Sequence, residues 1–242
     1  MKVGSLFAGI GGLDLGLERA GMEVVWQVEI DDFCNRVLEK HWPNVKRYRD
    51  VRDVGKHNLE PVDLICGGFP CQDISSAHTF KDKPGVEDGR RSGLWAHFAR
   101  LVGELHPLWV FAENVEAIRY AGRGLHAVLY DLACLGYDAE WRVLPARDVG
   151  APHKRARLWL VAHANSDREP DQSIHAQASI MSGIRPIIRR WPDPPRGLRV
   201  ANGIPNRVDR LRSLGNAVVP QVAEWIGRRI MEFSRLTLSG DR

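Results

Sequence analysis

Cysteine is scarce in this sequence, with 4 residues in 242, and the four thiols form no recognisable ligand set or disulfide framework. No two of them are spaced as CxxC, and none has a histidine partner at zinc-binding spacing. We therefore expect no disulfide scaffold and no metal. So few cysteines are typical of a reducing compartment, which favours a cytoplasmic location.

Long apolar runs are also missing. The sequence contains no stretch of 18 apolar residues, so we expect no transmembrane helix and no membrane partner. Residues 1–7 lack the apolar core of a signal peptide. With 44% hydrophobic and 26% charged residues, the composition is that of an ordinary globular protein. The length suits one complete α/β domain with a small addition.

Lysine is absent from residues 164–212, although this segment holds nine arginines against five acidic residues. Its net charge of +4 equals the net charge of the whole chain, so the rest of the sequence is balanced. Arginine forms bidentate hydrogen bonds with phosphate and with guanine. The segment therefore indicates a polyanionic partner.

Strand-like and helix-like segments alternate over the first 160 residues. Apolar strands are predicted at residues 3–7, 24–28, 62–66, 108–112, 140–144 and 157–162. Helical spacing predicts helices near residues 13–20, 33–38, 95–105, 125–135 and 219–230. This alternation is typical of an α/β fold whose parallel sheet is covered by helices on both faces. Residues 165–206 show no period and are rich in Pro and Arg, which predicts a functional insertion.

A glycine-rich turn, residues 7–12, joins the first strand to the first helix. Glycine lets the backbone pass close to a ligand, and the helix amino terminus offers free N–H groups. Glu29 ends the second strand, where it can accept hydrogen bonds from ribose hydroxyls, and Asp50 can accept from an adenine amino group. The pattern favours a nucleoside cofactor at the strand ends, and the absence of GxGxxG disfavours a dinucleotide. A plain tight turn is the alternative.

Two further strand ends carry reactive groups. Cys71 lies in a Gly-Gly-Phe-Pro-Cys-Gln loop, a setting that suits a nucleophile. The other three thiols lie in apolar periodic segments and are predicted to be buried and inert: Cys34, Cys66 and Cys134. Glu113 follows an apolar strand, so its pKa should be raised, which suits proton donation to a ring nitrogen. A helix-capping role is the alternative for this carboxylate.

Residues 150–157 and 214–220 complete the set of motifs. In an extended chain, Arg155 and Arg157 would project to the same side and carry two guanidiniums toward a phosphate or a carbonyl oxygen. A solvated basic edge is the alternative. Asn216 would either cap the final helix or reach the cofactor, if that helix folds back beside the first strand.

Five motifs in this order resemble those of the DNA (cytosine-5) methyltransferase family. They are Phe-x-Gly-x-Gly-Gly at 7–12, Gly-Phe-Pro-Cys-Gln at 68–72, Glu-Asn-Val at 113–115, Arg-x-Arg at 155–157 and Gly-Asn-x-Val at 215–218. Gly-Arg-Arg-Ser-Gly-Leu at 89–94 looks like a further family segment. The resemblance covers residues 1–163 and 207–231, and it implies a Rossmann-like class I methyltransferase that uses S-adenosyl-L-methionine.

The resemblance also implies a role for each matching residue. The implied catalytic set is Cys71, Glu113, Arg155 and Arg157. The implied cofactor set is Phe7, Ala8, Gly9, Gly11, Gly12, Glu29, Ile30, Asp50, Val51, Gly68, Pro70, Leu94, Asn216 and Ala217. The expected DNA-binding set is Gln72, Ser75, Arg91 and Asn114, joined by Arg185, Arg189, Arg190, Arg196 and Arg199 of the basic segment.

The chemistry of the family explains why these residue types are needed. By resemblance, the Cys71 thiolate adds to C6 of cytosine, so that C5 takes the methyl group and S-adenosyl-L-homocysteine is the product. Glu113 would contact N3 and the exocyclic amine, while Arg155 and Arg157 would hold the carbonyl oxygen or the adjacent phosphate. Because duplex DNA hides C6 in the base stack, the target base must be flipped out.

The sequence departs from the family pattern at two places. His153 stands where the family commonly has Gln, although His can also donate a hydrogen bond. Residues 164–206 provide about 43 residues for target recognition, whereas the family usually has a sizeable small domain there. We expect a catalytic and cofactor-binding domain at 1–163, this short recognition insertion, and a carboxyl-terminal segment at 207–242 that packs back on the catalytic domain. A remnant that binds phosphate without reading sequence is the alternative for the insertion.

Three functions fit the sequence. The first is methylation of cytosine C5 in double-stranded DNA by a monomer of prokaryotic or phage origin, with a cognate restriction endonuclease as a candidate partner. The second is the same reaction on RNA, as in the tRNA-acting relatives of the family. The third is a DNA-binding protein with an inactive methyltransferase fold, against which the intact catalytic set argues. A nicotinamide dehydrogenase would leave the Pro-Cys loop and the Glu-Asn-Val element without a role.

Overall fold

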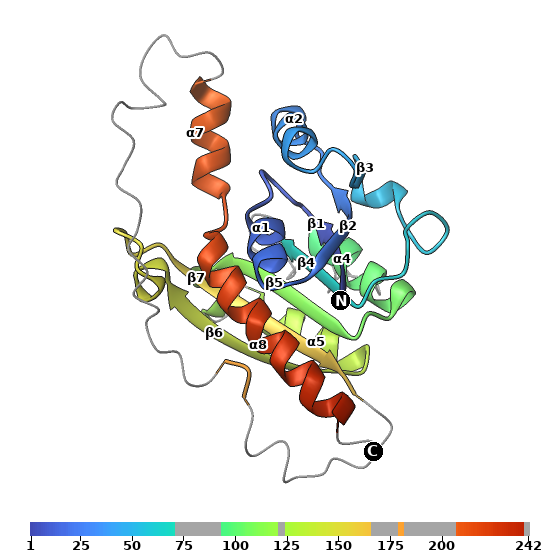
Figure 1. The fold of residues 1–242 in the computed structure, drawn as a ribbon. Helices are drawn as coiled ribbons and strands as arrows, with labels where there is room; N and C mark the ends of the chain where they lie inside the picture. Colours follow the sequence, from blue (N-terminus) through green and yellow to red (C-terminus); the bar gives the residue numbers. More distant parts are fainter. Residues whose placement is uncertain (71–92, 121–123, 166–178, 182–206, 240–242) are drawn as a thin grey trace, which may run out of the picture.

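The computed structural model describes residues 1–70, 93–120, 124–165, 179–181 and 207–239. Within them, a seven-stranded sheet in the order β3-β2-β1-β4-β5-β7-β6 forms the centre of the molecule (Figure 1). The strands are β1 (Lys2–Leu6), β2 (Glu23–Val28), β3 (Lys46–Tyr48), β4 (Leu64–Gly68), β5 (Trp109–Val115), β6 (Tyr137–Pro145) and β7 (Ala156–Ala164).

The sheet is mostly parallel, as predicted. The first five strands in the sequence pair in parallel, whereas β7 runs antiparallel to both of its neighbours, β5 and β6. β7 is thus the one strand of the described sheet that runs against the others. Ten residues separate β6 from β7, too few for the crossover that a parallel pair requires.

Helices cover both faces of the sheet. Successive residues of a strand point to opposite faces and pack in two separate hydrophobic cores. Figure 1 shows α8 crossing one face, where α1 also packs, with α4 and α5 behind the sheet. In β4, Leu64 and Cys66 join the core under α1 and α8, whereas Ile65 joins the core under α4 and α5. The helices are α1 (Gly12–Arg19), α2 (Asp32–His41), α4 (Leu94–Leu105), α5 (Leu125–Cys134), α7 (Arg207–Asn216) and α8 (Pro220–Ser239).

Two details at the carboxyl-terminal helices differ from expectation. α7 was not predicted, because its apolar residues Val208, Leu211 and Leu214 are exposed and alternate with arginines. Asn216 ends α7 and does not cap α8, which begins four residues later at Pro220. None of the helices in the described ranges is long and apolar enough to cross a membrane.

The described cysteines match the prediction in two of three cases. Cys34 and Cys66 are buried, and burial raises the pKa of both thiols. Cys134 is exposed, so the prediction for it was wrong. α5 turns Leu132 toward the sheet, and a residue two positions further along a helix points to the opposite side.

α1 and α8 approach each other backbone to backbone. A Cβ added at Gly16 would lie 2.5 Å from both the Ala223 Cβ and the Pro220 carbonyl oxygen. A Cβ added at Gly227 would lie 2.9 Å from the Ala20 Cβ. Glycine at these positions therefore sets the distance between the two helices, and it places the chain before α8 beside the start of α1.

We predict that Gly16→Ala lowers the free energy of unfolding by about 2 kcal/mol, because the added methyl group pushes α1 and α8 apart. The matched control is Gly103→Ala in α4, where the new Cβ would meet only a methyl tip of Leu135, at 3.1 Å. That change should be neutral or stabilising, as alanine is in most helix interiors. Urea unfolding compares the two variants with the wild-type protein. Equal losses in both variants would contradict the close packing.

Candidate functional site

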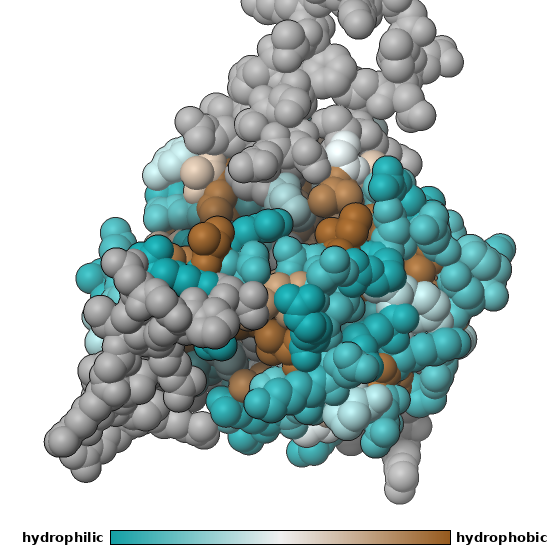
Figure 2. All heavy atoms as spheres, turned by 90° about the horizontal axis from the view of Figure 1, so that it is seen from above, coloured by the Kyte–Doolittle hydropathy of each residue, from teal (hydrophilic) through white to brown (hydrophobic). Residues whose placement is uncertain are grey.

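A cavity of about 1020 Å³ opens at the carboxyl ends of β1, β2, β4 and β5. Its size suits a nucleoside-sized ligand with room for a second group. Figure 2 shows hydrophobic atoms in recesses of a largely hydrophilic face. The predicted cofactor residues that line the cavity are Phe7, Ala8, Gly9, Gly12, Glu29, Ile30, Asp50, Val51, Gly68, Pro70, Leu94, Asn216 and Ala217. Gly11 is not among the lining residues, and a Cβ there would lie 2.4 Å from the Trp42 ring.

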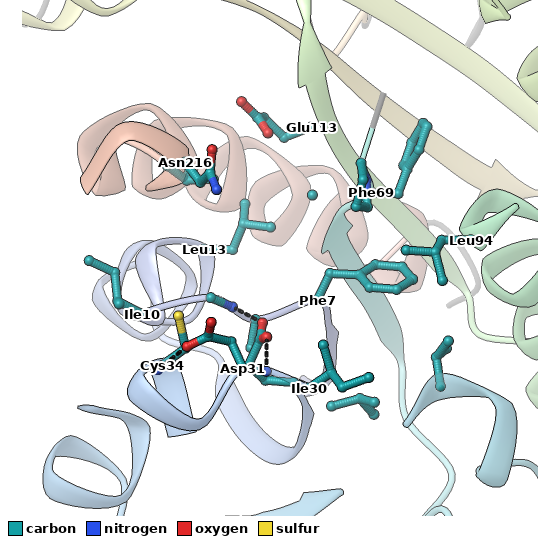
Figure 3. A pocket seen from close by; sticks show the side chains of 18 of the residues that line it. Phe7, Ile10, Leu13, Ile30, Asp31, Cys34, Phe69, Leu94, Glu113 and Asn216 are labelled. Atoms are coloured by element: carbon teal, nitrogen blue, oxygen red, sulfur yellow. Dashed lines mark hydrogen bonds between the residues drawn. The ribbon is translucent and has the colours of Figure 1, made fainter. Parts of the chain in front are cut away.

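The turn after β1 has a left-handed backbone at three residues, with φ of 52° at Phe7, 57° at Gly9 and 82° at Gly11. This path carries the Phe7 ring across the cavity toward Leu94 (Figure 3). No described atom lies within 4 Å of a Cβ added at Gly9, so the cavity is open beside that backbone. A Cβ added at Gly12 would lie 2.7 Å from the carbonyl oxygen of Val218, because the chain before α8 packs there.

Glu29 lies just beyond β2 with its carboxylate fixed by the backbone. It accepts hydrogen bonds from the N–H of Gly9 at 2.7 Å and from the N–H of Asp31 at 2.8 Å (Figure 3). A carboxylate has about four lone-pair positions, so the group can still accept from hydroxyls of a ligand. The predicted ribose contact stays a prediction, but the acceptor is in place for it.

Asp50 begins a short 3₁₀ turn, η1 (Val51–Asp53), on the far side of the cavity. The guanidinium of Arg52 donates to its carboxylate at 2.5 Å, and these hydrogen bonds lower the pKa of Asp50 to about 2. The group is therefore an ionised acceptor at neutral pH. This agrees with the role predicted for Asp50 toward an amino group, which stays a prediction.

The carboxyl-terminal end of α7 and its connection to α8 form another wall of the cavity. Ser213 is buried against Cys34 of α2, with 3.6 Å between their oxygen and sulfur atoms. Arg212 pairs with Asp31 at 3.5 Å. Asn216 lies on the same wall (Figure 3), so of the two roles predicted for it the structure favours contact with a ligand over helix capping.

At the other end of the cavity, β5 presents Glu113. The side chain is buried, and burial raises the pKa of Glu113 to about 7, although Arg157 and Arg155 act to lower it. The raised pKa was predicted and is confirmed, whereas the helix-capping alternative was wrong because Glu113 lies within β5. Arg157 in β7 lies 3.1 Å from the Glu113 carboxylate. The two residues form a buried acid and a cation in direct contact.

Asn114 is also buried, next to Glu113 in β5. Its Nδ2 donates to the carbonyl oxygen of Phe69 at 2.9 Å, and its Oδ1 accepts from the N–H of Val115 at 2.8 Å. The side chain thus ties β5 to the backbone directly before Pro70. The DNA contact predicted for Asn114 stays a prediction.

Arg155 differs from the prediction that it would share one side of an extended strand with Arg157. β7 begins at Ala156, and Arg155 has a left-handed backbone with φ of 27°. Such a conformation costs about 1–3 kcal/mol in a residue other than glycine. The Arg155 guanidinium donates to the carbonyl oxygens of Gly215 at 2.7 Å and Ala217 at 2.6 Å. Arg157 lines the cavity, whereas Arg155 is not among its lining residues and contacts the backbone of residues that line it.

Several predicted residues lie outside the described ranges, and their roles stay predictions. They are Cys71, Gln72, Ser75, Arg91, Arg185, Arg189, Arg190, Arg196 and Arg199. The described chain stops one residue before Cys71, at Pro70 in the cavity wall. Across the part of the chain that is described, no cluster of His, Cys, Asp or Glu could hold a metal ion.

The cavity residues that sequence reasoning did not name include Arg52, His97, Arg212 and Ser213. His97 follows Leu94 by one helical turn, so helical spacing alone could have placed it in the cavity wall. Burial lowers the pKa of this imidazole. Arg212 and Ser213 gave no usable signal, because α7 itself was not predicted.

Comparisons with known proteins agree with this geometry. The family described as C-5 cytosine-specific DNA methylase matches residues 1–194. The chain is 37% identical over 173 residues to the Type II methyltransferase M2.BsuMI of Bacillus subtilis, covering 69% of this chain and 43% of that protein. It is 36% identical over 162 residues to the Type II methyltransferase M.HhaI of Haemophilus parahaemolyticus, covering 66% and 48%. The chain therefore spans less than half the length of these two relatives.

Solved structures similar to this chain are also described as methyltransferases. A protein assigned as a DNA modification methyltransferase, encoded within an E. coli prophage, superposes with a TM-score of 0.55 at 31% identity, covering 68% of this chain and 47% of that one. Spodoptera frugiperda DNMT2 superposes with a TM-score of 0.53 over 70% of this chain and 51% of its own. At 22% identity, that second likeness shows the fold alone.

We predict that Glu113 makes the protein less stable as the pH rises. Its pKa of about 7 in the folded state exceeds the usual value of 4.5, so the folded state binds more protons between these values. This contribution to stability is full below the usual value and is lost as the pH rises through 7. Glu113→Gln, which cannot ionise, should gain on the order of 2 kcal/mol relative to wild type between pH 5 and pH 8. Urea unfolding at both pH values tests this, and a constant difference would contradict it.

Proposed function

The chain belongs to the C-5 cytosine-specific DNA methylase family, and from that premise we propose that it transfers a methyl group from S-adenosyl-L-methionine to C5 of cytosine in double-stranded DNA. The observation that carries the proposal is the contact between buried Glu113 and partly buried Arg157, both of which line the same cavity as the glycine turn. A nucleoside-binding turn alone would fit many enzymes. Glu113, a protonatable acid at the other end of the cavity, can in addition donate a proton to a ring nitrogen of a pyrimidine.

S-Adenosyl-L-methionine fits the part of the cavity lined by the glycine turn. Support comes from the open space beside Gly9, the carboxylates of Glu29 and Asp50, and the apolar slot between Phe7 and Leu94. Glu29 would accept hydrogen bonds from the ribose hydroxyls, and Asp50 would accept one from the adenine amino group. When bound, the cofactor supplies a methyl group on a positively charged sulfur.

The target base would occupy the end of the cavity at β5 and β7. With a pKa of about 7, the Glu113 carboxyl keeps a proton in a large fraction of molecules at neutral pH. It can donate that proton to N3 of cytosine and accept a hydrogen bond from the exocyclic amine. Arg157, in contact with Glu113, balances the charge when the carboxyl ionises and can donate to the carbonyl oxygen of the base.

Cys71 supplies the nucleophile in this proposal. Its thiolate adds to C6, the C5 carbon takes the methyl group, the C5 proton leaves, and elimination of the thiolate restores the double bond. Phe69, two residues before Cys71, is anchored by Asn114, the neighbour of Glu113. The base must leave the DNA stack to reach these groups, which costs a few kcal/mol of unstacking.

The nucleic acid that accepts the methyl group, and the partner proteins, belong to the same proposal. We propose that the basic insertion at 164–206 contacts the DNA, through phosphate and through guanine edges. The Type II names of the relatives support a setting beside a cognate restriction endonuclease. We propose a monomer, because one chain holds the whole predicted catalytic set.

Cys71→Ser should reduce methyl transfer to duplex DNA at least ~10³-fold, because a serine hydroxyl is not ionised at neutral pH and cannot add to C6. The exposed thiol offers a matched control: Cys134→Ser should keep wild-type activity. Transfer of a labelled methyl group from S-adenosyl-L-methionine measures both variants. Activity in Cys71→Ser near that of wild type would remove Cys71 from the mechanism.

The acceptor can be tested with duplex DNA, single-stranded DNA and tRNA at equal cytosine concentration. We expect duplex DNA to be methylated fastest, and duplex DNA containing 5-fluorocytosine to form a covalent complex that survives denaturation. The complex persists because fluorine at C5 cannot leave as the proton does. Preferred methylation of tRNA would replace DNA by RNA as the substrate, and cofactor binding without any transfer would favour the inactive fold.

A further inference from the structure

The end of α7 and the α7–α8 connection form one wall of the cofactor half of the cavity. Arg155, directly before β7, binds two backbone carbonyl oxygens in this wall. Gly215 and Ala217 both line the cavity. The carbonyl oxygens of both accept hydrogen bonds from the same Arg155 nitrogen, at 2.7 and 2.6 Å. These carbonyls are acceptors near the end of a helix, where intrahelical partners run out and a cation is favourable.

Arg155 also lies close to the acid at the target end. It acts electrostatically on Glu113, and burial together with the charge of Arg157 lowers the pKa of the Arg155 guanidinium. Its Nε is buried and finds no acceptor among the described residues. The positive φ of Arg155 turns the side chain away from the course of β7, toward the α7–α8 connection. A strained backbone at Arg155, directly before β7 and close to Glu113, indicates that the contacts of its side chain have a functional role.

We propose that Arg155 is a positioning residue: it holds the wall at residues 215–217 in place for the cofactor and ties that wall to β7 beside the Glu113–Arg157 pair. The role rests on the proposed function. It differs from the role that the family resemblance implies, in which both arginines contact the target base or its phosphate. On our proposal Arg157 contacts the base directly, whereas Arg155, which does not line the cavity, acts on cofactor binding through the backbone that it holds.

The proposal predicts different effects on cofactor binding when Arg155 or Arg157 is replaced. Removing the Arg155 side chain frees the carbonyls of Gly215 and Ala217, so cofactor binding should weaken even when no DNA is present. Removing the Arg157 side chain leaves that wall intact, so cofactor binding should persist while methyl transfer fails. Arg119, which pairs with Glu116 and does not line the cavity, controls for the loss of an ion-paired arginine elsewhere in the fold.

The test is calorimetric titration of S-adenosyl-L-homocysteine into the full chain without DNA. Arg155→Gly is the main variant, because glycine accepts the positive φ and so removes the hydrogen bonds without adding strain. We expect its Kd to rise about tenfold or more. Arg155→Lys keeps one donor group and should fall between Arg155→Gly and wild type. Arg157→Gln and Arg119→Ala should stay within about threefold of wild type.

Methyl transfer then separates positioning from catalysis. In Arg155→Gly, KM for S-adenosyl-L-methionine should rise, with a much smaller change in kcat at saturating cofactor, whereas Arg157→Gln should lose kcat. Thermal unfolding of each variant without ligand shows that it is folded. An unchanged Kd in Arg155→Gly together with lost kcat would overturn the positioning role and restore a direct role in catalysis. Failure of the wild-type chain to bind the cofactor would instead overturn the proposed function.

Discussion

The close approach of α1 and α8 is the constraint on which the rest of this molecule depends. Because Gly16 has no side chain, the first and last helices meet at backbone distance. Gly12 lets the Val218 carbonyl rest against the start of α1 in the same way. Residues some two hundred positions apart therefore form one cavity wall beside β1. This contact also brings Asn216, and the carbonyl oxygens that Arg155 binds, to the cavity that the glycine turn lines.

Two carboxyl groups are buried in this part of the fold, Asp14 behind the cavity wall and Glu113 in the wall itself, and their surroundings set their charge. Asp14 lies beneath the glycine turn, where Ser5 and Gln27 donate to it at 3.0 and 2.9 Å, and burial raises its pKa to about 6. Glu113 has a cation beside it, yet burial outweighs the charge and its pKa reaches about 7. Asp50, at the edge, has the opposite shift because Arg52 binds it directly. The fold thus keeps one protonatable acid facing the target end of the cavity.

Much of this arrangement could be predicted from the sequence, because it follows from where strands end. Glu29 and Glu113 were placed correctly, since the carboxyl ends of parallel strands meet at one edge. Arg155 was not, because its left-handed backbone follows from contacts with residues sixty positions away. The reversal of β7 could have been read from its short link to β6. α7 was missed although its apolar residues recur every three positions, because the stretch is short and polar residues, including arginines, separate them.

The pairing of the first helix with the last also bears on how the chain folds. Leu17 of α1 is covered by Ile226 and its neighbours in α8, so one face of the sheet lacks its cover until the ribosome has made that late helix. During synthesis the apolar residues of that face would stay exposed to water and to other chains. Contacts that span most of the sequence also form slowly. The core shared by α1 and α8 would therefore be among the last parts of the described fold to become protected from water.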